Sequence, residues 1–179
     1  MSSYPKTIEL KDGTSILVRP MTDRDLDRSF DFFRRLPEED RLFLRVDVTN
    51  REVLERRMHP DGWDEESCFR IVAEEGGEII ADATLCRPKH GWTSHTATLR
   101  YIIDRGFRHK GLASILVREL FVAAVREGVE KAEVEIMEDN VGAIKSVEKL
   151  GFKREGVLKD FVTDIKGRKH NLVILSYFI

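Results

Sequence analysis

The sequence predicts an α/β protein with a mixed, largely antiparallel sheet flanked by helices. Two stretches each have the pattern of a strand, a loop and a helix, at residues 99–125 and 132–152. Alternating apolar residues around turn signals, at residues 8–19 and around a Gly-Gly pair, predict two hairpins. At 179 residues and 41% hydrophobic content, we expect one domain, residues 1–179, with a sizeable core.

The N-terminal part predicts a hairpin followed by two helices. Residues 8–19 alternate about a turn of Lys11, Asp12, Gly13 and Thr14, and its second arm, residues 16–18, would begin the sheet. Thr22 is expected to cap a helix that ends at Pro37. The apolar face of that helix consists of Leu26, Phe30, Phe33 and Leu36. A shorter helix is expected near residues 50–58.

Further strands are expected in the middle and at the end of the chain. Residues 69–74 and 78–85 predict a hairpin, and residues 171–179 predict an apolar strand. That last strand could pair across an interface, so a homodimer stays open. Cys68 and Cys86 fall in neighbouring strands, which leaves a bridge open, but a chain without a secretion signal favours reduced thiols.

Composition and charge exclude several kinds of partner. Thirty basic and 32 acidic residues give a net charge of −2, so we expect neither nucleic acid nor a membrane as partner. The absence of an apolar run of about 20 residues and of an apolar signal core predicts a cytoplasmic protein. No metal site is expected, because the histidines are scattered without ligand spacing: His59, His90, His95, His109 and His170.

The loop at residues 104–111 and the helix after it favour the binding of a pyrophosphate. The N–H groups at a helix start and the positive end of its dipole attract anions, and Gly111 allows close approach. A nucleoside-triphosphate loop would need Lys-Ser/Thr where Leu112 and Ala113 stand. A dinucleotide loop would need a glycine triplet that is lacking here. A basic, solvated loop that caps an ordinary core helix remains an alternative.

Residues 108–113 also match the pattern Arg/Gln-x-x-Gly-x-Gly/Ala, and the second segment continues the match. Its strand is followed by Asn140, then by Ala143, and its helix ends in Lys-x-Gly-Phe at residues 149–152. In both segments the chain resembles the GNAT superfamily of acyl-CoA N-acyltransferases. Residues 16–25 are similar, less specifically, to the start of bacterial protein-lysine acetyltransferase domains.

The resemblance implies a GNAT fold in which two central strands splay apart to bind acetyl-CoA as cosubstrate. The acetyl group would pass by direct attack to a primary amine on a small molecule or a protein. By position, the residues implied for the cofactor are Ile103, Arg108, His109, Lys110, Gly111, Leu112, Ala113 and Asn140. The acceptor would lie near residues 24–58 and 86–98, the second of which contains His90, Trp92 and His95.

The general base differs between branches of the superfamily. One branch, which includes lysine acetyltransferases, has a Glu at the position of Thr98, which cannot act as a base. Another branch, which includes ribosomal-protein alanine acetyltransferases, has a Glu five residues before the capping Asn, which corresponds to Glu135. Glu135 is therefore the candidate catalytic residue, while a solvent-facing strand glutamate is the alternative interpretation.

The general acid of many members is a Tyr at the position that Val147 occupies here. Tyr101 and Tyr177 are the strand tyrosines that could replace it, although a core aromatic with a hydrogen-bonded hydroxyl is the expected role of each. An N-acetyltransferase is the function that we expect. An acyl-CoA-binding regulatory module without turnover is the alternative, because both Thr98 and Val147 depart from the catalytic pattern.

Overall fold

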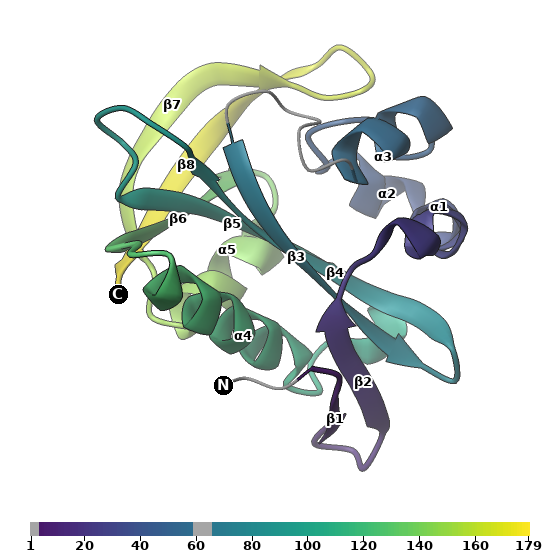
Figure 1. Ribbon diagram of the computed structural model, residues 1–179. Coiled ribbons are helices and arrows are strands. Elements are labelled where there is room, and N and C mark those ends of the chain that lie inside the picture. Colours follow the sequence, from purple (N-terminus) through teal and green to yellow (C-terminus); the bar gives the residue numbers. More distant parts are fainter. Residues whose placement is uncertain (1–3, 59–65) are drawn as a thin grey trace.

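The structure is a computed structural model that describes residues 4–58 and 66–179. Its described part forms one eight-stranded sheet in the order β1-β2-β3-β4-β5-β6-β8-β7 (Figure 1). The strands are β1 (Lys6–Glu9), β2 (Ser15–Pro20), β3 (Glu66–Glu75), β4 (Glu78–Pro88), β5 (Thr96–Ile103), β6 (Lys131–Met137), β7 (Lys153–Thr163) and β8 (Lys169–Phe178). The helices are η1 (Asp23–Asp25), α1 (Leu26–Arg35), α2 (Glu38–Arg41), α3 (Arg51–Met58), η2 (Arg105–Phe107), α4 (Leu112–Arg126) and α5 (Val141–Lys149).

Strands β5 and β6 form the one parallel pair among the strands that the structure describes. Their register begins with Thr96 opposite Lys131 and ends with Thr98 opposite Glu133. Beyond this point β5 continues to Ile103 and β6 to Met137 without pairing to each other. The two central strands therefore splay apart, as the resemblance implied.

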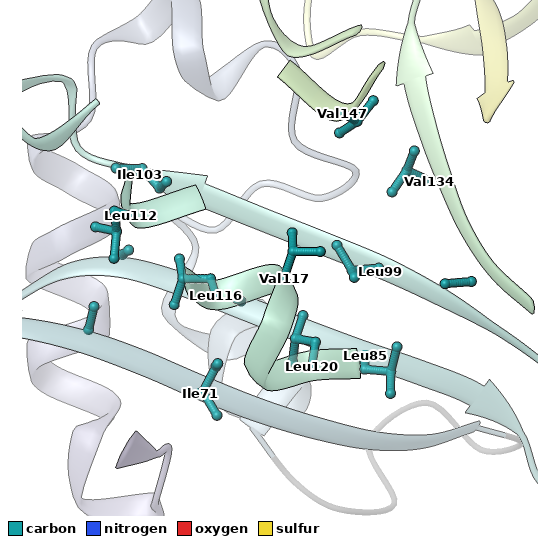
Figure 2. Close-up of a cluster of buried hydrophobic side chains, with 14 of the residues drawn as sticks. Ile71, Leu85, Leu99, Ile103, Leu112, Leu116, Val117, Leu120, Val134 and Val147 are labelled. Carbon is teal, nitrogen blue, oxygen red and sulfur yellow. The ribbon is translucent and has the colours of Figure 1, made fainter. Parts of the chain in front are cut away.

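Two hydrophobic clusters cover the two faces of the sheet. Helices α4 and α5 lie on one face, and α1, α2 and α3 gather on the other side (Figure 1). Figure 2 shows Leu112, Leu116 and Leu120 of α4 directed at the strands, with Val134 and Val147 near each other. The second cluster contains Phe32, Phe33, Leu36, Val48, Leu54, Val72 and Ile79. The sheet is thus the middle layer of an α/β protein, as its sequence predicted.

The helix ends that the sequence predicted are confirmed. Thr22 and Asp25 form a capping box at the start of η1, which leads directly into α1. The Asn140 side chain accepts a hydrogen bond from the Ala143 N–H at the start of α5. Gly151 has a φ of +97°, the left-handed conformation expected after the helix.

Strand β7 and the short helix α2 were not predicted. Residues of β7 are exposed at nearly every position, so neither face of the strand shows an apolar alternation. Its pairing partner β8, in contrast, is largely buried and was expected from its sequence. Helix α2 begins directly after Pro37, which ends the preceding helix, and it has only four residues.

The expectation of reduced cysteines is wrong for this structure, because Cys68 and Cys86 form a disulfide. The two residues are register partners on β3 and β4, with their Cα atoms 4.1 Å apart. Direct cross-strand pairing therefore brings the two sulfur atoms together.

None of the helices in the described residues is both long enough and apolar enough to cross a lipid bilayer.

Candidate functional site

The loop before α4 has two residues in the left-handed conformation. Gly111, with a φ of +92°, is the N-cap of α4, and His109 is also left-handed, with a φ of +64°. The Ile115 N–H donates to the Gly111 carbonyl at 3.3 Å and so continues the helix. The N–H groups of the first turn, at Leu112, Ala113 and Ser114, have no partner in the helix itself. A helix start of this kind is the backbone feature on which the sequence-based prediction of a pyrophosphate site rests.

The turn of the β1–β2 hairpin packs against this loop. The Lys11 N–H donates to the Lys110 carbonyl at 3.1 Å, and the Lys110 ammonium pairs with Asp12 at 2.8 Å. A hydrogen bond from the Lys110 ammonium lowers the pKa of Asp12 from 3.8 to about 2. Methylene groups of Lys11 lie 3.4–3.7 Å from the position that a Cβ on Gly111 would occupy. The hairpin is therefore part of the wall around the start of α4.

Arg108 holds the end of β5 and joins it to α2. Its Nε donates to the Ile103 carbonyl at 2.9 Å, and its Nη2 donates to Asp40 at 2.7 Å. Arg105 contacts the same carboxylate through its Nε at 3.0 Å. Burial acts to raise the pKa of Asp40, but the hydrogen bonds from Arg105 and Arg108 outweigh it and lower that pKa. The guanidinium predicted to bind the cofactor thus also positions the loop.

A hydroxyl pair connects β5 with α5 where the strands splay. Tyr101 Oη and Ser146 Oγ lie 3.2 Å apart. Burial raises the pKa of Tyr101, and the hydrogen bond with Ser146 offsets this only in part. Val147, the next residue on α5, is buried in the core and has no hydroxyl to contribute. Tyr177 packs instead against Phe121 and Phe152, with ring centroids 5.0 and 5.7 Å away.

Glu135 lies on the opposite face of the sheet from α4. Its register partner on β8 is Ile174, and its neighbours on β6, Val134 and Ile136, pack into the α4 side of the core. The Glu135 carboxylate forms an ion pair with Arg45, from the segment between α2 and α3. Because β-strand side chains alternate, Glu135 shares its face with Glu133, the register partner of Thr98. The two alternative base positions of the family therefore lie on one face.

The two regions predicted to bind the amine acceptor, residues 24–58 and 86–98, lie in different parts of the structure. Residues 86–98 precede and enter β5 at the end that pairs with β6, whereas the loop at residues 104–111 follows its other end. Trp92 is 93% exposed there, and His95 is exposed. The segment around α2, in contrast, contacts the loop through Asp40 and β6 through Arg45. Residues 24–58 thus contact both the loop and β6, whereas the second region meets β6 through Thr96–Thr98 and does not reach the loop.

Asp40, Arg45 and Ser146 are site residues that sequence reasoning missed. Arg108 and Asp40 are 68 residues apart, and Tyr101 and Ser146 are 45 apart. No local pattern distinguishes Asp40 from the two acidic residues before it. These contacts become visible only when the sheet places α2 and α5 beside β5 and β6.

Comparisons with known proteins show a family match and several relatives. The profile of the Acetyltransferase (GNAT) family matches residues 27–152. Acetyltransferase Pat of Mycolicibacterium smegmatis is 27% identical over 151 residues, which cover 82% of this chain and 44% of Pat. L-amino acid N-acetyltransferase AaaT of Escherichia coli is 29% identical over 93 residues, 51% of this chain and 57% of AaaT. The chain therefore spans about half the length of either relative.

Solved structures share the fold at low sequence identity. The GNAT domain of S. lividans PAT has a TM-score of 0.81 at 21% identity, covering 100% of this chain and 99% of that one. RimL, a ribosomal alpha-N-protein acetyltransferase in complex with coenzyme A, has a TM-score of 0.77 at 14% identity, covering 97% and 98%. Since the family profile covers well over half of its residues, this chain belongs to the acetyltransferase (GNAT) family.

Proposed function

We propose that this protein transfers the acetyl group of acetyl-CoA directly to a primary amine. The observation that carries the proposal is the splay between β5 and β6 beside the left-handed Gly111 at the start of α4. An extended ligand with a pyrophosphate fits this arrangement, because the splayed strands leave backbone groups unpaired and the helix start attracts phosphate.

The cofactor contacts proposed here follow the loop. The backbone N–H groups of residues 109–113 would bind the pyrophosphate, and the end of β5 at Ile103 would hold the pantetheine arm. Leu112 is buried, so its contribution would be its N–H rather than its side chain. Asn140 is used as the N-cap of α5, so its effect on the cofactor would come through the position of that helix.

Glu135 is the general base in this proposal. An ammonium must lose a proton before its nitrogen can attack, and Glu135 would accept that proton directly or through a water. The nitrogen then bonds to the thioester carbon, the carbon–sulfur bond breaks, and CoA leaves as a thiolate. The new amide nitrogen gives its second proton to solvent, and the thiolate takes a proton from solvent. Arg45 keeps the carboxylate oriented before the substrate arrives. Both cysteines are in the disulfide, which supports direct attack without an acyl-cysteine intermediate.

The acceptor would approach from the side of α1, α2 and α3, because Glu135 and Arg45 lie there. A primary amine is the proposed class. The relatives include a protein named as an amino-acid acetyltransferase and a solved ribosomal-protein acetyltransferase, so both small amines and protein amines belong in the test.

A turnover screen tests the function. Release of CoA thiol from acetyl-CoA is measured with lysine-containing peptides, peptides with free N-termini, amino acids and polyamines. Amine-dependent thiol release, with one acetyl group gained by mass spectrometry, is the expected result. Tight binding of acetyl-CoA with no turnover for any class would contradict it and favour a regulatory acyl-CoA-binding module.

A further inference from the structure

The β1–β2 turn places a lysine at the phosphate-binding end of α4. Two interactions hold the turn there: the Lys11 N–H donates to the Lys110 carbonyl, and the Lys110 ammonium pairs with Asp12. The Lys11 methylenes lie beside the place that a Cβ on Gly111 would occupy. Of these methylenes, Cε is nearest, 3.4 Å from the place of a Cβ on Gly111. Since the ammonium is one bond beyond Cε, its charge lies close to the first turn of the helix.

The arginine and lysine side chains of the loop, Arg105, Arg108 and Lys110, are already paired with carboxylates. Arg108 pairs with Asp40 at 2.7 Å, and Lys110 pairs with Asp12 at 2.8 Å. Within residues 4–58 and 66–179, no carboxylate forms an ion pair with Lys11. Lys11 is also exposed, so its ammonium can reorient without breaking an existing contact. A phosphate at the start of α4 would therefore be neutralised more effectively by Lys11 than by the arginine and lysine side chains of the loop.

We propose that Lys11 binds the CoA pyrophosphate from outside the loop and so completes the cofactor site with a residue of the N-terminal hairpin. The inference rests on the proposed function, since it assumes that CoA binds at Gly111. The backbone N–H groups would hold the phosphate oxygens on one side, and the Lys11 ammonium would neutralise charge on the other. The hairpin turn, bound through its backbone to Lys110, fixes the distance between the two.

Two variants separate the charge of Lys11 from the packing of its stem. Lys11→Met keeps an unbranched stem against Gly111 but removes the charge, and Lys11→Arg keeps the charge. We expect Lys11→Met to weaken CoA binding about five- to tenfold, as for a partly solvated ion pair with phosphate, and Lys11→Arg to bind nearly as the wild type does. Lys159→Met, at an exposed position on β7, is the matched control.

Isothermal titration with CoA and with dephospho-CoA, at low and at high salt, measures the effect. If Lys11→Met loses the same factor of affinity for CoA and for dephospho-CoA, and its affinity depends less on salt than that of the wild type, the result supports a contact with the pyrophosphate. Unchanged affinity in Lys11→Met overturns the proposal, as does weakening with CoA alone, which would place Lys11 at the 3′-phosphate. A wild-type protein that binds neither ligand would overturn the proposed function itself, and this inference with it.

Discussion

At the scale of single residues, Gly111 is the position where a substitution should act most directly on the cofactor. Its left-handed φ disfavours any side chain, and a Glu there would also oppose phosphate. Gly111→Glu should abolish the rise in melting temperature that acetyl-CoA causes by binding the folded state. Differential scanning fluorimetry measures this, with Gly142→Glu on α5 as control because a Cβ meets nothing there. A full shift in a folded Gly111→Glu protein would exclude this site.

Glu135 is the residue whose loss should affect chemistry and not binding. Loss of a general base costs about 100- to 10,000-fold in rate, so Glu135→Gln should lower kcat by that range and leave CoA affinity nearly unchanged. Glu133→Gln, on the same strand face, is the matched control. Steady-state kinetics and CoA titration separate the two effects. A decrease in kcat of less than about threefold would show that Glu135 is not the general base and favour the alternative of a solvent-facing strand glutamate.

Tyr101 and Tyr177 should both be dispensable as acids. The CoA thiol resembles an ordinary thiol, with a pKa of about 8.5, and its thiolate leaves without strong help. Burial raises the pKa of Tyr101, which makes it a weaker acid, and Tyr177 packs among Phe121 and Phe152. Tyr101→Phe and Tyr177→Phe should each retain most of the turnover. A hundredfold loss of turnover in either variant, together with disappearance of a basic limb in its pH–rate profile, would show that this tyrosine acts as the general acid.

At the scale of secondary-structure elements, buried ion pairs hold the helices to the sheet. Arg19 of β2 donates to Asp25 at 2.6 Å, and Asp25 also accepts from the Thr22 N–H at 2.8 Å. Burial acts to raise the pKa of Asp25, but Arg19 and Thr22 outweigh it and lower that pKa from 3.8 to about 2. The junction between β2 and α1 therefore depends on an ionised carboxylate.

This junction predicts an acid-sensitive part of the stability. Because the folded pKa lies below the unfolded one, the contribution is present above about pH 4 and is lost as pH falls toward 2. The difference corresponds to about 2 kcal/mol at neutral pH. Asp25→Asn should lower the free energy of unfolding at pH 7 and converge with the wild type near pH 2. Urea unfolding at several pH values checks this, and Asp31→Asn, exposed on α1, should follow the wild type throughout.

At the scale of the whole molecule, the candidate site is assembled from both layers of the fold. The α4 layer provides the helix start, and the layer of α1, α2 and α3 provides Asp40 and Arg45, which reach the loop and β6. The splay between β5 and β6 opens between these layers. The proposed N-acetylation would use both layers, one for the cofactor and one for the amine.

The sequence by itself determined what depends on neighbours along the chain. The turn at Gly111, the cap at Asn140 and the apolar face of α4 follow from local sterics and helical spacing, and each was confirmed. The family resemblance followed from the same two segments. Strand β7 was not predicted, because an exposed edge strand has no buried face and so shows no alternation of apolar and polar residues.

Only the tertiary structure decided which distant groups meet. The carboxylate partners of Arg108 and Lys110, the ion pair of Arg45 with Glu135, and the disulfide of Cys68 with Cys86 all depend on sheet register and layer packing. Such contacts join residues from separate elements, so no spacing along the chain encodes them. Electrostatic pairing depends on separation in space, and the fold alone sets that separation.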